Sequence, residues 1–122
     1  MFDVGTQVYS LLTTTATITN LVPTDNIYSV WPDTVTQFPS IIFDDTQSDI
    51  NFQDNKPKGS HAVTKIDVFI KDDTPTPIAT AICNAFRDAY WSCEYNELVP
   101  DPDASIRHRS LRFSRPLWDD NA

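Results

Sequence analysis

Glycine is scarce in this chain, with two among 122 residues. A loop that cradles phosphate groups depends on glycine, because its backbone must approach the ligand closely, so no such loop is expected. Basic residues are also few: nine lysines and arginines stand against seventeen aspartates and glutamates, which gives a net charge of −8. A free-standing binder of DNA or RNA needs excess positive charge to displace counterions, as does a protein that binds anionic membranes. Both classes are therefore disfavoured.

Cysteine and histidine are too few for a structural metal site. Cys83 and Cys93 are the only cysteines, and His61 and His108 do not stand at ligand spacing. We therefore expect no metal and no cofactor. Reduced thiols are the default for two cysteines in a cytosolic protein, while a disulfide between them stays open as a geometric alternative. Because it stands between two arginines, His108 is expected to be neutral and at the surface.

Long apolar runs are missing as well. The N-terminus lacks the basic segment and apolar run of a secretory signal peptide, and no stretch approaches the length of a membrane span. We expect one domain, 1–122, that is made and works in a cytoplasm or in something assembled there.

The clearest pattern that is present is a strand running into an amphipathic helix. Across residues 61–71 apolar and polar side chains alternate, which is the period of a strand with one buried face. Across residues 76–90 the period changes to that of a helix, with one large apolar or aromatic side chain at every fourth position. That face consists of Ile78, Ile82, Phe86 and Tyr90, with Ala81, Ala85 and Ala89 beside them.

The rest of the chain completes an α+β pattern. A helix is expected at 3–13 with Asp3 as its N-cap, followed by a second helical turn that stops at Pro23. Strands are expected at 27–31, from 40 less regularly to 52, at 93–99 and at 105–115. This order predicts a mainly antiparallel sheet of about four to five strands with two main helices packed on one face. We expect a flexible loop at about 44–60, where 53–60 is either a hairpin turn or a mobile loop, and a loose tail at 116–122.

No catalytic site emerges from the residues, and we do not expect an enzyme. The sharpest coincidence is Pro32-Asp33 followed by Asp54-Asn55-Lys56, the loose pattern of a metal-dependent nuclease of the restriction type. That chemistry needs Asp-x-Lys on a rigid strand, whereas Asp54 lies in a polar run where it caps a turn. The neighbours Asp44 and Asp45 point to opposite faces of a strand, so they cannot converge on one bond.

Charge is segregated along the chain, and this favours protein contacts. Four arginines lie in the last strand, three of them sharing a face with two apolar residues, while acidic residues gather near the start of the expected loop. A face that mixes arginine with apolar side chains is typical of a protein–protein interface; arginines that extend round a sheet edge, or a plain solvated surface, are the alternatives. The candidate interface residues are Asp44, Asp45, Asp49, Arg107, Arg109, Leu111, Arg112, Phe113 and Arg115.

Five segments, taken in order, give a resemblance to a known family. They are Thr-Asp-Asn-Ile-Tyr-Ser-Val-Trp-Pro at 24–32, Phe-Pro-Ser-Ile-Ile-Phe at 38–43, Lys-Ile-Asp-Val-Phe-Ile at 65–70, the alanine-rich helix at 78–90 and Arg-His-Arg-Ser-Leu-Arg-Phe at 107–113. Over nearly the whole chain this order resembles the small tail completion proteins of long-tailed bacteriophages, also called tail terminators or tail-to-head joining proteins.

The resemblance implies an α+β domain that forms a ring, usually a hexamer, at the head-proximal end of the phage tail. Such a ring stops tail polymerisation and joins the tail to the head. Its implied partners are further copies of itself, the tail tube protein and the head connector or stopper protein, while DNA passes through its lumen without specific binding. A closed ring needs two different, complementary patches, for which the acidic segments and the arginine strand are candidates. The alternatives are a head-side adaptor or stopper and, in a different class, a metal-dependent nuclease.

Overall fold

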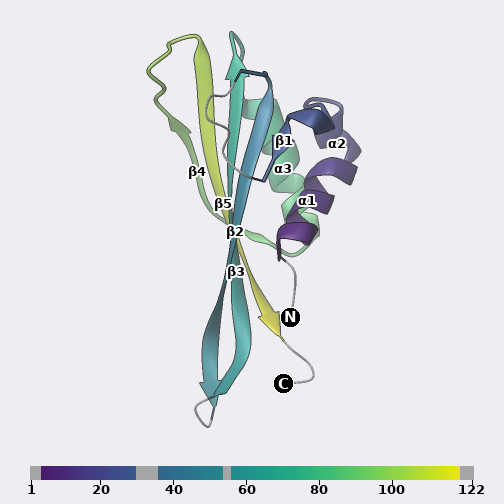
Figure 1. The fold of residues 1–122 in the computed structure, drawn as a ribbon, viewed down its shortest axis with the longest axis vertical. Helices are drawn as coiled ribbons and strands as arrows, with labels where there is room; N and C mark the ends of the chain where they lie inside the picture. Colours follow the sequence, from purple (N-terminus) through teal and green to yellow (C-terminus); the bar gives the residue numbers. More distant parts are fainter. Residues whose placement is uncertain (1–3, 30–35, 54–55, 119–122) are drawn as a thin grey trace.

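The computed structural model describes residues 4–29, 36–53 and 56–118 (Figure 1). Its helices are α1 (Val4–Thr14), α2 (Ala16–Thr19) and α3 (Thr76–Asp88), with a single 3-10 turn, η1 (Thr24–Asn26). Its strands are β1 (Ile27–Tyr28), β2 (Ser40–Gln53), β3 (Lys56–Lys71), β4 (Ser92–Val99) and β5 (Ile106–Trp118). The predicted α+β class is confirmed, whereas the expected N-cap Asp3 lies outside the described residues.

The five strands form one sheet in the order β1-β2-β3-β5-β4. β3 lies at the centre and pairs antiparallel with β2 on one side and with β5 on the other. β4 also runs antiparallel to β5. Only β1 runs parallel to its neighbour, and it is short: Ile27 lies opposite Ile41 and Tyr28 opposite Ile42. The expectation of a mainly antiparallel sheet is therefore confirmed.

The expected flexible loop at 44–60 is wrong, because most of this stretch belongs to a long hairpin. β2 and β3 stay paired from Ser40 opposite Phe69 to Gln53 opposite Lys56, with irregularities beside Asn51. In Figure 1 the far half of this hairpin extends well past the helices. The pairing of such a hairpin is made by antiparallel backbone hydrogen bonds, so it needs no apolar alternation in the sequence.

The expectation of a loose tail at 116–122 is wrong for residues 116–118. β5 continues through Pro116 and ends with Trp118 opposite Gly59 of β3. β5 therefore supports the lower part of the hairpin as a third strand. Residues 119–122 lie outside the described part of the chain.

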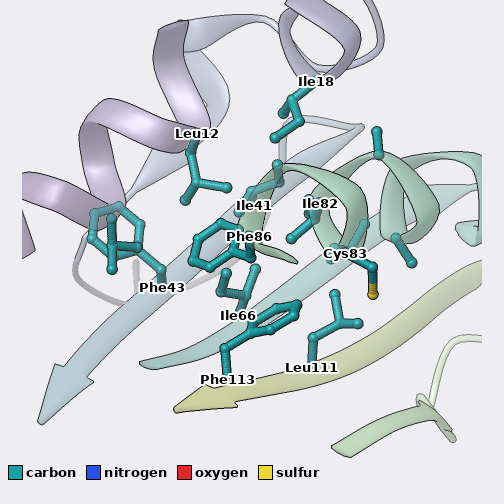
Figure 2. Packing of buried hydrophobic residues seen from close by; sticks show 14 of the residues in the cluster. Leu12, Ile18, Ile41, Phe43, Ile66, Ile82, Cys83, Phe86, Leu111 and Phe113 are labelled. Atoms are coloured by element: carbon teal, nitrogen blue, oxygen red, sulfur yellow. The ribbon is translucent and has the colours of Figure 1, made fainter. Parts of the chain in front are cut away.

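One hydrophobic core lies between the sheet and its three helices, which all cover the same face (Figures 1 and 2). Ile66 of β3 is completely buried, together with Leu111 and Phe113 of β5. From above, Phe86 of α3 stacks on Phe113 with 4.7 Å between the ring centroids. Burying each of these large side chains contributes about 1.5–3 kcal/mol relative to leaving it exposed.

The C-terminal end of α3 is fixed by a Schellman motif. The N–H of Trp91 donates to the carbonyl of Phe86 at 2.9 Å, and the N–H of Tyr90 donates to that of Arg87 at 2.9 Å. The accompanying apolar contact is the edge-on packing of the Trp91 and Phe86 rings, 5.7 Å apart. Tyr90 itself takes a positive φ of 69°, a conformation that only glycine adopts without a steric penalty.

Replacing Tyr90 by glycine is expected to stabilise the protein. Tyr90 is 82% exposed, so Tyr90→Gly loses little packing and should raise the free energy of unfolding by about 0.5–1 kcal/mol. Denaturant unfolding measures the change. Tyr90→Ala is the matched control, because it removes the same ring but keeps the Cβ atom and should not stabilise. Equal stability of the glycine and alanine variants would contradict the prediction.

Candidate functional site

The arginines of β5 divide between the two faces of the sheet, as their alternation predicted. Arg107 and Arg109 lie beside the N-terminal end of α3, where with Asp72 and Asp73 they line a hollow of about 450 Å³. Nε of Arg109 donates to Oδ1 of Asn96 on β4 at 2.5 Å. This pair of arginines therefore stays at the surface, next to the end of the helix layer.

Arg112 and Arg115 lie further along the same strand. Arg112 projects from the opposite face, where its Nε is 3.4 Å from Oε2 of Glu94, and both side chains are well exposed. Arg115 is half-buried and lies opposite Ala62 of β3. The structure thus does not gather the four arginines into one patch.

Two of the proposed interface residues belong to the core instead. Leu111 and Phe113 are completely buried beneath α3, and we withdraw them as contact residues. Leu111 and Phe113 point to the same face of the sheet as Arg107 and Arg109. Helix α3 covers that face only at Leu111 and Phe113.

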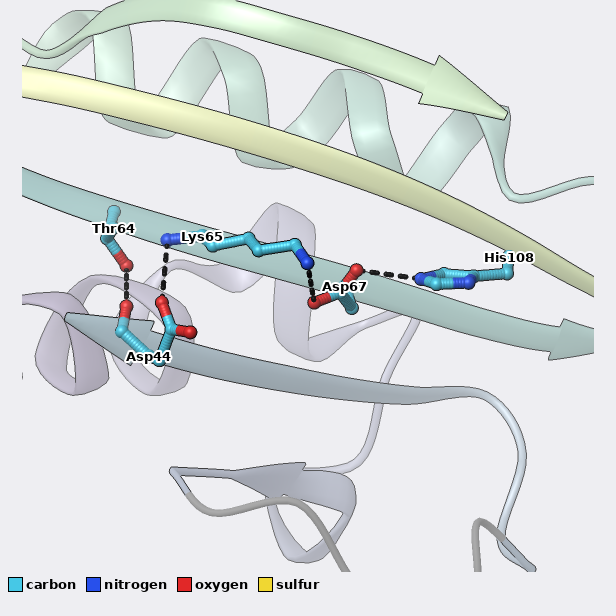
Figure 3. Close-up of polar contacts among 5 residues, drawn as sticks. All are labelled: Asp44, Thr64, Lys65, Asp67 and His108. Carbon is cyan, nitrogen blue, oxygen red and sulfur yellow. Dashed lines mark hydrogen bonds and ion pairs between the residues drawn. The ribbon is translucent and has the colours of Figure 1, made fainter. Parts of the chain in front are cut away.

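The acidic candidates lie on β2, in the hairpin. Asp44 is exposed, and its Oδ1 accepts a hydrogen bond from the N–H of Lys65 at 3.2 Å. Its carbonyl also accepts a hydrogen bond from the hydroxyl of Thr64 (Figure 3). Asp45 and Asp49 occupy ladder positions on the same strand, while their side chains are outside what the structure describes.

The face of the sheet opposite the helices carries a buried aspartate that is hydrogen-bonded to a histidine (Figure 3). Asp67 is 2% exposed, and its Oδ1 lies 2.7 Å from Nε2 of His108. Its second oxygen lies 4.0 Å from Nζ of Lys65. The His108 ring in turn stacks on Phe69, with 4.2 Å between the ring centroids. The expectation that His108 is a surface residue is wrong, because its ring packs on Phe69 and is hydrogen-bonded to the buried Asp67, which leaves the side chain 14% exposed.

A hollow of about 460 Å³ lies over this pair, lined by side chains from β3, β4 and β5. Ser110 lies on its floor at 2% exposure, and its hydroxyl has no hydrogen-bond partner among the described residues. Towards the edge of the same face, the hydroxyl of Ser114 donates to Glu94. Tyr95 lines the hollow from β4, and its hydrogen bond with Glu97 raises the pKa of its phenol.

An aspartate, a histidine and a serine on one face invite comparison with a hydrolytic triad. In a triad the histidine accepts a hydrogen bond from the serine that it activates. Within the described part of the chain Ser110 makes no such bond to His108. These residues therefore form a structural polar cluster and lack the contact that would activate a nucleophile.

Metal chemistry finds no support in the described residues either. No group of three or more histidine, cysteine, aspartate or glutamate side chains stands ready to hold a metal ion in the described ranges. Asp33 and Asp54, the carboxylates of the nuclease pattern, lie outside these ranges. None of the helices described has the length and apolar character needed to cross a bilayer.

The two cysteines are free thiols. Burial raises the pKa of the Cys83 thiol, and the neighbouring Cys93 raises it further. Sγ of Cys93 donates a weak hydrogen bond to the carbonyl of Tyr95 at 3.4 Å. Because the thiolate is the reactive form, a raised pKa keeps Cys83 inert near neutral pH.

Comparison with known proteins identifies this arrangement of strands and helices. The family described as Tail completion protein gp17 matches residues 6–115. The chain belongs to this family. A chain from the virion of a native gene transfer agent (GTA) particle shares the fold, with a TM-score of 0.59 and 16% identity over 95% of both chains. No curated protein matches.

As a tail completion protein, the molecule is a structural component of the phage virion and is located in the tail. The resemblance drawn from the order of segments is thereby confirmed. A protein in such an assembly works through contacts with neighbouring tail and head proteins.

The buried pair in the tail completion protein is expected to be strongly coupled. Asp67→Ala, His108→Ala and the double variant form a cycle whose coupling should be about 0.5–3 kcal/mol, because each partner otherwise stays buried without the other. Urea unfolding measures each free energy. Lys65→Ala is the control: this lysine is 53% exposed and 4.0 Å away, so its loss should cost no more than about 0.5 kcal/mol. Strict additivity of the two single variants would contradict the prediction.

Proposed function

We propose that this tail completion protein forms a ring, most simply a hexamer, at the head-proximal end of the tail tube. The ring stops tail polymerisation there and presents the surface to which the head connector binds. The observation that carries the proposal is the family match, which runs from the first turns of α1 to near the end of β5. The absence of an activated nucleophile among the described residues is consistent with a structural role.

The uneven covering of the sheet supports the placement of the protein around a channel. Helices cover one face only (Figure 1), so the other face is available to line a lumen. By strand parity this face carries four acidic residues in the described part, Asp44, Asp67, Glu94 and Glu97, against three basic ones, Lys65, Lys71 and Arg112. A wall with excess negative charge repels the DNA backbone, so DNA passes without binding.

Charged side chains are further candidates for contacts with neighbours in the virion. Arg107 and Arg115 take part in no ion pair within the described ranges, and Asp44 is exposed on the hairpin. We assign Arg107, Arg109 and Arg115, with Asp45 and Asp49, to contacts between copies or with the tube and the connector, whereas Asp44 and Arg112 lie on the face that we place towards the lumen. A head-side adaptor or stopper is the weaker alternative, because adaptors are commonly all-helical and stoppers more nearly all-β.

Deleting the gene from its parent phage tests this proposal directly. We expect electron micrographs of the lysate to show tails of uncontrolled length beside DNA-filled heads, because nothing ends tube growth. Supplying the gene in trans is the control and should restore joined particles. Tails of normal length that stay unattached would restrict the role to joining. Intact infectious particles would contradict the proposal.

A further inference from the structure

We propose that neighbouring copies in the ring join edge to edge: β4 of one copy pairs antiparallel with β2 of the next, through main-chain hydrogen bonds. The inference rests on the proposed ring and specifies the contact that closes it.

β4 forms an open edge of the sheet. It pairs with β5 on one side, and the strand order places no strand on the other. Six of its eight residues are exposed, including Tyr95 at 40% and Leu98 at 56%. Its ladder with β5 is regular from Tyr95 to Val99, beyond a shift at Glu94. An edge of this kind presents a row of unpaired N–H and C=O groups to a further strand.

β2 provides the second open edge. On its outer side it pairs with β1 only at Ile41 and Ile42. From Phe43 to Gln53 no other described strand lies on that side. In Figure 1 the far part of β2 extends beyond the helices, and β4 stands at the opposite border of the sheet, away from α1 and α2. The helix layer therefore leaves both edges accessible.

The directions of the two edge strands suit a ring. β2, β3, β5 and β4 each run antiparallel to the next, so β2 and β4 run in opposite directions. A copy rotated about an axis roughly along the strands keeps these directions, and its β4 meets the neighbouring β2 antiparallel. Two different edges then meet, which is the heterologous contact that a closed ring requires.

The register follows from the ladders already present. Within one copy, Val99 of β4 pairs with His108 of β5, His108 pairs with Phe69 of β3, and Phe69 pairs with Ser40 of β2. Val99 and Ser40 therefore lie at the same height in the sheet. Because side chains alternate with period two, the neighbour can shift only by an even number of residues if the helices stay on one side. If the neighbour is shifted by two residues, Val99 lies opposite Ile42, which already pairs with β1. If the shift is four residues, Val99 lies opposite Asp44. This is the first register in which the edge of β2 is not occupied by β1.

Over the regular part of β4 this register keeps the carboxylates of the two edges apart. With Val99 opposite Asp44, Leu98 lies opposite Asp45 and Glu97 opposite Thr46. The one carboxylate of β4 that comes level with another is Glu94, at the ladder shift; by count it falls beside Asp49, where a like-charge pair costs stability.

The same shift gives a geometry that can close. Four residues correspond to about 13 Å along a strand, and four strands to about 19 Å across the sheet. The shift divided by the width is the tangent of the angle between the strands and the ring axis. This angle is about 35°, within the range of closed barrels. Six copies would contribute on the order of 24 strands, more than the 16–18 that already enclose an aqueous channel in porins.

Disulfide trapping in assembled particles tests the contact. A gene-deleted phage is complemented with Asp45→Cys plus Leu98→Cys in a Cys83→Ala, Cys93→Ser background, and purified particles are oxidised and run on a non-reducing gel. We expect a ladder of cross-linked copies, because these positions face each other across the pair. The matched register control is Gln47→Cys plus Leu98→Cys, displaced by about 7 Å along the same strand, which should give little cross-linking.

The outcomes separate this inference from the proposed function. Infectious particles show that each variant folds and assembles. A ladder from the control pair instead would overturn the register, and particles that contain the protein but give no ladder would overturn edge pairing while the ring proposal stands. A dimer band from Leu98→Cys alone would indicate two β4 edges meeting about a two-fold axis, which also overturns the inference. The proposed function fails separately, when gene deletion leaves particles intact.

Discussion

The register of β3 between β2 and β5 is the constraint on which the rest of the structure depends. At one position Ile66 is flanked by Phe43 and Leu111, and all three enter the core. At the next, Asp67 faces the other side of the sheet. A slip of one residue would exchange these positions and bring the carboxylate under the helices. The hydrogen bond that Asp67 accepts from His108 opposes the slip from the other face, because a buried carboxylate without its partner is costly.

Once this register is fixed, the single helix layer decides which surfaces are left for assembly. α3 lies close to the sheet through small residues such as Ala79 and Ala81, which are nearly buried, and it ends where Trp91 closes its last turn. The layer covers β5 at Leu111 and Phe113 but not at Arg107. The opposite face, the β4 edge and the far half of the hairpin are left without a helix. In an isolated domain such open edges favour aggregation, whereas in a virion they are available for specific contacts.

Periodicity predicted the fold wherever one face of an element is buried. The change from period two to period four across residues 61–88 placed β3 and α3 correctly, because each buries one face in the same core. Tyr90 was wrongly included in the helical face: it lies beyond the end of α3 and is 82% exposed. The hairpin at 44–60 carried no such signal, since its polar residues show no apolar alternation and its pairing uses the backbone. Leu111 and Phe113 were misplaced because strand parity alone does not show where a helix ends. The Asp67–His108 pair was missed because its members are 41 residues apart, and no local pattern reports a contact across strands.

A contact made mainly by the backbone also explains why the sequence carries no diagnostic motif. Catalytic and metal sites require particular side chains at particular spacings, and these leave a recognisable signature. Edge pairing instead requires strands of adequate length, opposite direction and matched parity, and many different side chains satisfy these conditions. The family was accordingly visible as an order of segments along the chain, which is the level at which such an interface constrains a sequence.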